Sequence, residues 1–372
     1  MSWRCVDRGL GLSVGALLAV AGCTGSTTTT TTTTPCWASA SSVDDCGGIE
    51  ALVASAKTEK TLNVIALPPE WANYGEILKG FTAKYGIKIN SANPTGSARD
   101  EIDAVKLPAS SKAAPDVVDL NMKVALANTS LFAPYRVMTW RDIPGSQKET
   151  TGLWVQDYGG LMSIGYDSTK VPDVTMLQDL LGAPYAGKVA LGGDPTVSDQ
   201  ALAGVMMASI ANGGSIDDIS RGVDFFHQLK LKRNFVRTLG TSANVKAGLT
   251  PVLFEWDYRS VSHIKDLPGW RLFIPSGAVI GDYYAQAVNK NAPHPAAARL
   301  WEEYLYSDEG QNLFLRGGFR PVRQAAMNAL ATVDYVAASA LPAVTDVPQI
   351  LTQTQTAAAA KYLAANWARA TA

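Results

Sequence analysis

Tryptophan and carboxylate side chains occur together where two expected strands end. The chain from residue 252 predicts a buried strand that ends in Glu255 and Trp256, and Asp257 follows directly. Trp71 follows an earlier strand of the same kind. Aromatic faces attract cations by about 0.5 kcal/mol when exposed and about 2 kcal/mol when desolvated, and carboxylates offset the cation's charge. These four residues indicate a site for an amine or quaternary ammonium ion. The alternative, in which both tryptophans only pack against the core, stays open.

Further polar and aromatic side chains follow the other expected strands. They are Tyr74, Thr95, Ser97, Asp119, Tyr158, Asp194, Thr196, Tyr283 and Tyr284. The hydroxyls of Thr95, Ser97 and Thr196 precede expected helices, where backbone N–H groups bind anions such as a phosphonate. The same side chains also serve as simple helix caps. The phenolates of Tyr283 and Tyr284 would suit ferric iron as hard oxygen donors, unless the pair is structural. Three ligand classes therefore stay open, with a polyamine-like cation narrowly ahead.

The sequence gives little support for catalysis. Glu255 and Asp257 lie on one face of their expected strand, and such a pair can act as general acid and base. The three histidines, His227, His263 and His294, are far apart in the sequence, and no HExxH, GxSxG, P-loop or spaced cysteine motif occurs. We expect a binding protein with no cofactor and no metal ligand set. A secreted hydrolase or transferase with a carboxylate site is the alternative.

The first residues of the chain predict export. Arg4 and Arg8 precede an apolar stretch about half as long as the ~20 residues that a membrane span needs. A basic start, a short apolar region and small residues before a cleavage point describe a signal peptide, here residues 1–22. The segment Val-Ala-Gly-Cys that ends at Cys23 resembles the bacterial lipobox, which predicts that this cysteine is lipidated. An ordinary signal peptide that happens to abut a cysteine is the alternative.

The segment 23–50 is expected to be a disordered tether. Residues 24–35 are almost entirely threonine, so they offer too little apolar surface to offset the entropy of ordering. Cys5 is removed with the signal peptide and Cys23 carries lipid, so Cys36 and Cys46 are the remaining pair. Outside the cytoplasm we expect them to form a disulfide. Two free thiols are the alternative.

Composition bounds the class of protein. The chain has 372 residues, of which 47% are hydrophobic and 17% are charged, with a formal net charge of −1. These values are ordinary for a globular protein, and the length suffices for two domains. Because nucleic-acid binding usually requires a basic face, the neutral balance argues against a nucleic-acid partner.

Strands and helices are expected to alternate along the body of the chain. The expected strands are 61–67, 88–92, 117–120, 161–167, 188–192, 252–256, 271–275 and 285–289. The expected helices are 76–85, 99–106, one from 175 to 182, one from 215 to 230, 295–306, 308–316 and a closing region at 347–370. This alternation predicts an α/β fold with a parallel sheet.

Four stretches resemble the type 2 periplasmic solute-binding proteins, the extracellular receptors of ABC importers. They are NVIALPPEWANYGEILKGFTAKYGIKI (63–89), APDVVD (114–119), VALGGDPTVS (189–198) and residues 294–323 with LYSDEGQNLFLRGGFRPVR. Their order is most similar to the branch of ferric iron, polyamine and aminoalkylphosphonate receptors. The resemblance implies two α/β lobes with a ligand cleft at the hinge. Lobe 1 would comprise 60–158 and lobe 2 would comprise 159–282. Residues 283–372 would return to lobe 1 and add closing helices.

The resemblance also implies the activity and the partners. Ligands of open α/β sheets bind at the carboxyl ends of the strands, so the residues named above would line the cleft. The lobes would close on a small-molecule solute and deliver it to an ABC permease. We expect a monomer, outside the cytoplasm and held to the cell membrane by its N-terminal lipid. A structural envelope lipoprotein is a further alternative.

Overall fold

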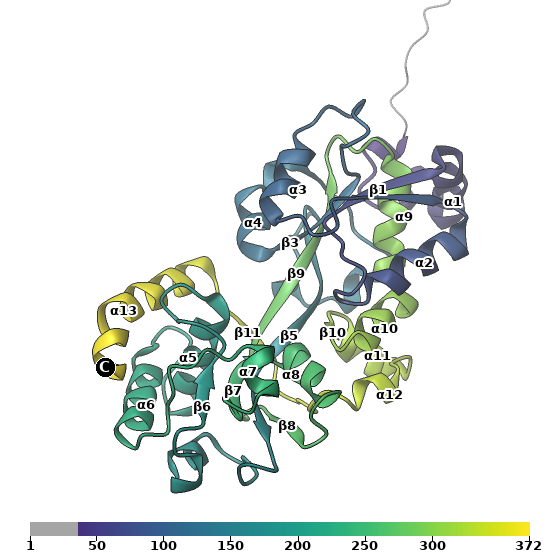
Figure 1. The fold of residues 1–372 in the computed structure, drawn as a ribbon. Coiled ribbons are helices and arrows are strands. Elements are labelled where there is room, and N and C mark those ends of the chain that lie inside the picture. Colours follow the sequence, from purple (N-terminus) through teal and green to yellow (C-terminus); the bar gives the residue numbers. More distant parts are fainter. Residues whose placement is uncertain (1–35) are drawn as a thin grey trace, which may run out of the picture. The chain divides into compact units, whose positions relative to one another are not determined.

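A computed structural model describes residues 36–372 of the chain (Figure 1). The predicted signal peptide (1–22), the predicted lipidation site Cys23 and the threonine run lie outside the described residues. Within the described part, no helix is long and apolar enough to cross a membrane.

Eleven strands form the sheets of residues 36–372. They are β1 (Thr61–Ile65), β2 (Lys88–Ala92), β3 (Val117–Asn121), β4 (Phe132–Ala133), β5 (Val155–Asp167), β6 (Val189–Leu191), β7 (Val252–Trp256), β8 (Trp270–Phe273), β9 (Ile280–Asn289), β10 (Arg320–Pro321) and β11 (Gln349–Ile350). Strands β1 and β2 pair in parallel, as do β6 and β7. Strands β5 and β9 are antiparallel to each other, β5 also to β7, and β9 also to β3. The expected parallel sheet is thus corrected to a mixed one, because two long strands of opposite direction run through it.

Helices flank these strands. They are α1 (Gly48–Glu59), α2 (Tyr74–Tyr85), α3 (Ala98–Val105), α4 (Met122–Ala127), α5 (Asp199–Ala211), α6 (Ser220–Leu231), α7 (Ser242–Lys246), α8 (Asp257–Ile264), α9 (Pro295–Leu305), α10 (Asp308–Arg316), α11 (Gln324–Leu330), α12 (Tyr335–Ala338) and α13 (Gln353–Thr371). The helix expected to begin at Thr175 is instead a short 3-10 turn, Leu177–Leu181. We call β1–β4 with α1–α4 and α9 lobe 1, and β6–β8 with α5–α8 lobe 2.

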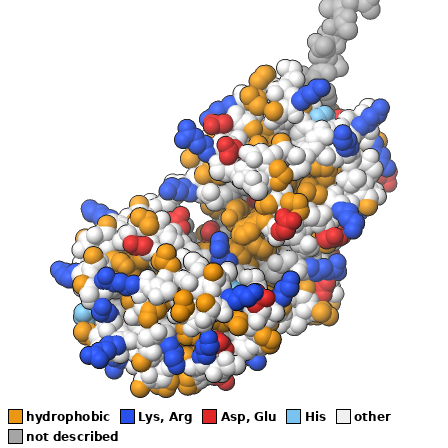
Figure 2. Space-filling view, in the orientation of Figure 1, with side chains coloured by type: hydrophobic (Ala, Val, Ile, Leu, Met, Phe, Trp, Pro, Cys, Tyr) orange, Lys and Arg blue, Asp and Glu red, His pale blue; other side chains and the backbone are white. Residues whose placement is uncertain are grey.

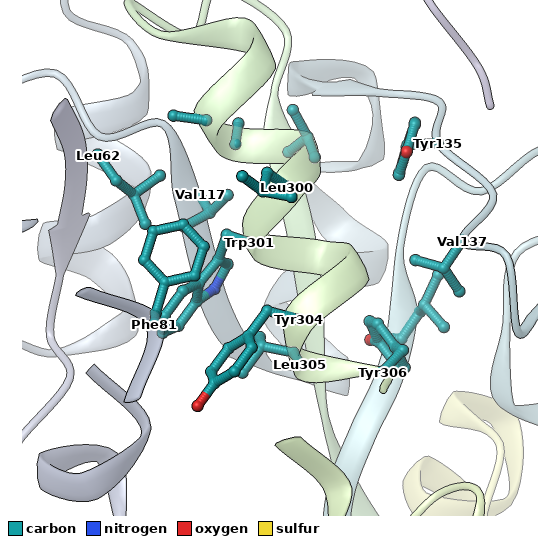
Figure 3. Close-up of a cluster of buried hydrophobic side chains, with 14 of the residues drawn as sticks. Leu62, Phe81, Val117, Tyr135, Val137, Leu300, Trp301, Tyr304, Leu305 and Tyr306 are labelled. Carbon is teal, nitrogen blue, oxygen red and sulfur yellow. The ribbon is translucent and has the colours of Figure 1, made fainter. Parts of the chain in front are cut away.

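Helix α9 lies at the centre of the core of lobe 1 (Figure 3). Its Trp301 is fully buried, and the ring of Phe81 in α2 packs 5.3 Å from it and 5.6 Å from Tyr304. Leu62 of β1 belongs to the same cluster. Burial of each such side chain contributes about 1.5–3 kcal/mol. The core of lobe 1 thus joins β1 and α2 to α9, which lies more than two hundred residues later in the chain.

The C-terminal helix packs on lobe 2, which corrects the expected return of this segment to lobe 1. Ala359, Leu363 and Trp367 recur every fourth residue on one face of α13, and all three are buried. The ring of Trp367 lies 5.4 Å from Phe226 of α6. The apolar stripe of α13 therefore completes the core formed by α5 and α6.

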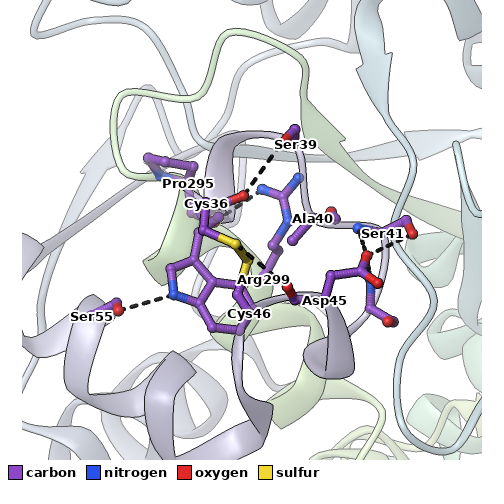
Figure 4. The surroundings of a disulfide bond; sticks show 11 residues. Cys36, Ser39, Ala40, Ser41, Asp45, Cys46, Ser55, Pro295 and Arg299 are labelled. Carbon is purple, nitrogen blue, oxygen red and sulfur yellow. Dashed lines mark hydrogen bonds between the residues drawn. A yellow bond between two sulfur atoms is a disulfide. The ribbon is translucent and has the colours of Figure 1, made fainter. Parts of the chain in front are cut away.

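Residues 36–50 are folded, which corrects the expected disordered tether over this part of its range. Cys36 and Cys46 form a disulfide (Figure 4), and Trp37 beside it is buried and donates its Nε1–H to Ser55 Oγ at 2.9 Å. The buried Arg299 of α9 donates its Nε–H to the carbonyl of Ala40 at 2.8 Å. The disulfide, the buried Trp37 and the hydrogen bond from Arg299 thus hold residues 36–50 against the rest of lobe 1.

Removal of this disulfide is expected to destabilise the protein. Cross-linking a loop of this length restricts the unfolded chain and contributes about 2.5 kcal/mol. We expect the double variant Cys36→Ser, Cys46→Ser to lose that amount of unfolding free energy in urea titrations. Its stability should not respond to a reductant, whereas the wild type should fall to the same value. Equal stability of the oxidised wild type and the double variant would contradict the prediction.

Candidate functional site

The loop after β1 carries Trp71 in a strained backbone. Ala66, Ala72 and Asn73 have φ angles of 56°, 49° and 63°, in the left-handed region that costs non-glycine residues about 1–3 kcal/mol each. Asn73 is held from outside, because its Nδ2 donates to the carbonyl of Leu313 in α10 at 2.9 Å. Strained conformations of this kind gather at ligand sites, so the loop is a candidate for solute contact.

Trp71 belongs to a cluster of rings from three elements. Its ring lies 5.7 Å from Tyr258 at the start of α8, 6.0 Å from Tyr284 in β9 and 5.0 Å from Phe319. Tyr158 of β5 stacks on Tyr284 at 5.3 Å. We call these five residues the aromatic cluster. Trp71, Tyr258 and Tyr284 are half-buried, so rings from lobe 1, from lobe 2 and from β9 all reach solvent.

Hydrophobic side chains are distributed unevenly over the surface shown in Figure 2. Hydrophobic side chains gather over one region of the face drawn in Figure 2, whereas lysines and arginines are spread over the remainder. A gathered apolar surface of this kind marks a ligand or partner site more often than scattered single residues do.

A buried carboxylate lies behind the cluster. The Oδ2 atom of Asp119 accepts hydrogen bonds from the hydroxyls of Tyr74 at 2.8 Å and Tyr158 at 2.7 Å. The Tyr158 oxygen in turn accepts the indole N–H of Trp71 at 2.9 Å. Burial raises the pKa of Asp119 to about 7, although the two tyrosine donors oppose this shift. Asp119 is therefore connected to the loop without being exposed to a solute.

Two carboxylates near the aromatic cluster, those of Asp282 and Asp199, are exposed to solvent. Asp282 of β9 is in contact with solvent, yet the protein around it removes enough hydration to raise its pKa to about 6, and the charge of Asp199 adds to this. Asp282 is close enough to Tyr258 and Tyr284 to raise the pKa of both hydroxyls. Sequence reasoning missed Asp282, because only strand register shows which side of β9 meets the cluster.

The hydroxyl groups of Ser97 and Thr196, which were expected to bind an anion, form hydrogen bonds to residues close by in the sequence. Ser97 caps α3, since its Oγ accepts the N–H of Asp100 at 3.3 Å and donates to the Asp100 carboxylate at 2.7 Å. Thr196 donates to the carboxylate of Asp194 at 2.7 Å. Thr95 lies two residues before Ser97 and is exposed. A carboxylate beside each loop disfavours a phosphonate. Helix capping accounts for Ser97, and a local bond to Asp194 accounts for Thr196.

The three residues at the end of β7 point into the protein, which corrects their expected place in the cleft. His263 Nε2 lies 3.1 Å from Oε1 of the buried Glu255, and Trp256 is in the core of lobe 2. Asp257 is fully buried and pairs with Arg320, whose Nε lies 2.6 Å from Oδ2. All five residues of β7 are buried, so neither face of this strand is open to a solute.

Adjacent strand residues separate the tyrosine pair. Successive side chains of a strand point to opposite faces, and Tyr283 and Tyr284 are neighbours in β9. Tyr284 joins the aromatic cluster, whereas Tyr283 is buried against the backbone beside Gly159. The two hydroxyls therefore do not form a paired set of oxygen donors.

Solved structures share this fold. A protein of Bordetella parapertussis described as an extracellular solute-binding protein has a TM-score of 0.68 at 15% identity and covers 85% of this chain and 100% of its own. Ferric iron-binding protein A of Mannheimia haemolytica, in an open conformation, has a TM-score of 0.62 at 17% identity, with 82% and 98% covered. Iron-bound HitA of Pseudomonas aeruginosa has a TM-score of 0.56 at 19% identity, with 82% and 97% covered. At such identities the likeness shows the fold alone.

No curated protein matches the sequence. The match that decides the family is to the bacterial extracellular solute-binding proteins, and it spans residues 114–341. This family transports solutes, so the chain is a binding protein rather than an enzyme, with the expected two-lobed α/β fold. Because the match covers more than half of the chain, this protein belongs to the bacterial extracellular solute-binding protein family.

Proposed function

We propose that the protein captures a small organic cation, such as a polyamine, outside the cytoplasmic membrane and delivers it to an ABC permease. The observation that carries the proposal is the group of half-exposed rings of Trp71, Tyr258 and Tyr284 beside the exposed carboxylate of Asp282. Aromatic faces and a carboxylate together favour an ammonium group over an anion.

Capture would follow from hinge closure. Trp71 is in lobe 1 and Tyr258 is in lobe 2, so a solute in contact with both rings binds the closed arrangement better than the open one. Its differential affinity shifts the equilibrium toward closure, which a permease can recognise. We further propose that the protein acts as a monomer, anchored by a lipid on Cys23.

Ferric iron is the second candidate ligand, because proteins of the same fold carry that name. The donor set of this chain suits it less. Iron would need deprotonated phenolates, whereas burial raises the pKa of both Tyr258 and Tyr284 above the usual tyrosine value. Among residues 36–372, no group of three or more histidine, cysteine or acidic side chains is placed to hold a metal ion.

A thermal-shift screen of the protein without its signal peptide tests the proposal. We expect spermidine or putrescine to raise the melting temperature as the ligand concentration rises above Kd, and aminoethylphosphonate and ferric citrate to have no effect. Asp282→Asn should weaken amine binding at least about tenfold, since it removes the counter-charge. Asp44→Asn, a carboxylate exposed on another part of the surface, is the matched control. If only ferric citrate stabilises the protein, the proposed ligand is wrong and the protein binds ferric iron instead of an amine.

A further inference from the structure

Asp119 is connected to the strained loop through a single tyrosine. The buried carboxylate lies near the end of β3, and its Oδ2 accepts the Tyr158 O–H at 2.7 Å. The same Tyr158 oxygen accepts the Nε1–H of Trp71 at 2.9 Å. Oδ1 of Asp119 has no hydrogen-bond partner among residues 36–372. The contacts thus run from a buried acid to the indole of the aromatic cluster.

The chemistry of the donors fixes the direction of each bond. An indole N–H only donates, so Tyr158 accepts from Trp71 and must use its one proton toward Asp119. The hydrogen bonds of Tyr74 are fixed in the same way. Its oxygen accepts an N–H from Nε2 of Gln286 at 2.9 Å, so its own proton goes to Asp119. Oδ2 is therefore an acceptor in both bonds, and a proton taken up by Asp119 must go to Oδ1.

Protonation weakens the chain of bonds. Hydrogen bonds to an ionised carboxylate are roughly twice as strong as those to a neutral acid. A proton on Oδ1 of Asp119 weakens both tyrosine bonds, and Tyr158 then no longer fixes the Trp71 indole as firmly. The conformation of an exposed loop is thus connected to the charge of a buried group.

The surroundings of Asp119 make such protonation accessible. The titratable groups that face it are Tyr74 from α2, Glu101 from α3, Asp157 and Tyr158 from β5, Tyr284 from β9, and Glu302 and Tyr306 at α9. Each is an acid or a phenol. Since none of these groups supplies a positive charge, burial outweighs the two tyrosine hydrogen bonds and raises the pKa of Asp119 to about 7.

We propose that Asp119 is a positioning residue, whose ionised carboxylate fixes the Trp71 indole for solute binding through the Tyr158 hydroxyl. The proposal rests on the proposed function where it takes Trp71 as a solute contact. Affinity should then rise with pH as Asp119 loses its proton. A bound cation also favours the ionised acid, so binding should release a proton.

The ligand-free protein tests the chain of bonds directly. Indole N–H resonances of 15N-tryptophan-labelled protein are recorded across pH, with Trp71→Phe to assign the signal of Trp71. We expect that signal to titrate with a midpoint near about pH 7, and to lose this titration in Asp119→Asn and Tyr158→Phe. Tyr135→Phe is the matched control, since it removes a buried hydroxyl that donates to a different carboxylate, that of Glu303.

Two results would overturn the proposal. One is a Trp71 signal in the wild type that does not move between about pH 6 and pH 8, and the other is an unchanged midpoint in Tyr158→Phe. With spermidine as the probe, affinity should be at least about threefold higher at pH 7.5 than at pH 6. This ratio should fall in Tyr158→Phe to the smaller pH dependence that Asp282 contributes, since the pKa of that carboxyl is about 6. The resonance titration needs no solute, so it can succeed even where the proposed amine ligand fails.

Discussion

Replacement of Asp257 by alanine is expected to destabilise the protein by about 3–5 kcal/mol, because it leaves a buried guanidinium without its counter-ion. Asp257 is fully buried, and Nε of Arg320 lies 2.6 Å from its Oδ2. Its other oxygen accepts the backbone N–H groups of Leu161 and Tyr258, each at 2.9 Å. The carboxylate thus ties β5, α8 and β10 together.

Urea unfolding at neutral pH measures this effect. The double variant Asp257→Ala, Arg320→Met should lose less stability than Asp257→Ala alone, since no charge is left unpaired in the interior. Asp266→Ala is the matched control: its carboxylate pairs with Lys246 at 3.2 Å on the surface, and its loss should cost less than about 1 kcal/mol. If Asp257→Ala keeps its stability and instead loses solute affinity, Asp257 is a ligand contact, as its position in the sequence suggested.

Local signals in the sequence predicted many elements well. The expected strand 88–92 and the expected helix 308–316 have the same bounds in the structure. The start of the helix is decided within a few residues, because Ser307 caps it by accepting the N–H of Gly310. Helix α5 was missed, because it is apolar on nearly every side and shows no periodicity. The packing partner of α13 was also missed, since it depends on residues far along the chain.

The site was predicted only in part. Strand ends drew attention to Trp71, Tyr74, Asp119 and Tyr158, which the structure joins by hydrogen bonds. Their role in solute binding remains a prediction. The same reasoning failed at β7, because a strand buried on both faces leaves no side for a ligand. Periodicity predicts that a strand ends, but tertiary packing decides what its last side chains meet.

Gly159→Ala is expected to destabilise the protein by about 3 kcal/mol, since the crossing strands are too close for a side chain at this position. A Cβ atom at Gly159 would lie 2.1 Å from the carbonyl oxygen of Asp282 and 2.7 Å from Cα of Tyr283. Both are backbone atoms of β9, so relief requires the two strands to separate. At Gly160 the added carbon would instead meet side-chain atoms, namely the ring of Tyr258 at 2.4 Å and Oδ1 of the buried Asp257 at 2.7 Å.

These two neighbours make a sensitive comparison. Gly159→Ala should lower the unfolding free energy and speed the hydrogen exchange of β9 amides. Gly160→Ala should displace Tyr258 and press on the buried Asp257, so it should weaken solute binding as well as lower stability. Gly145→Ala is the matched control, because a Cβ there meets no atom within 4 Å, and we expect a change below about 0.5 kcal/mol. Equal stability of Gly159→Ala and Gly145→Ala would show that β5 and β9 lie further apart, and the aromatic cluster across them would then lose its fixed support.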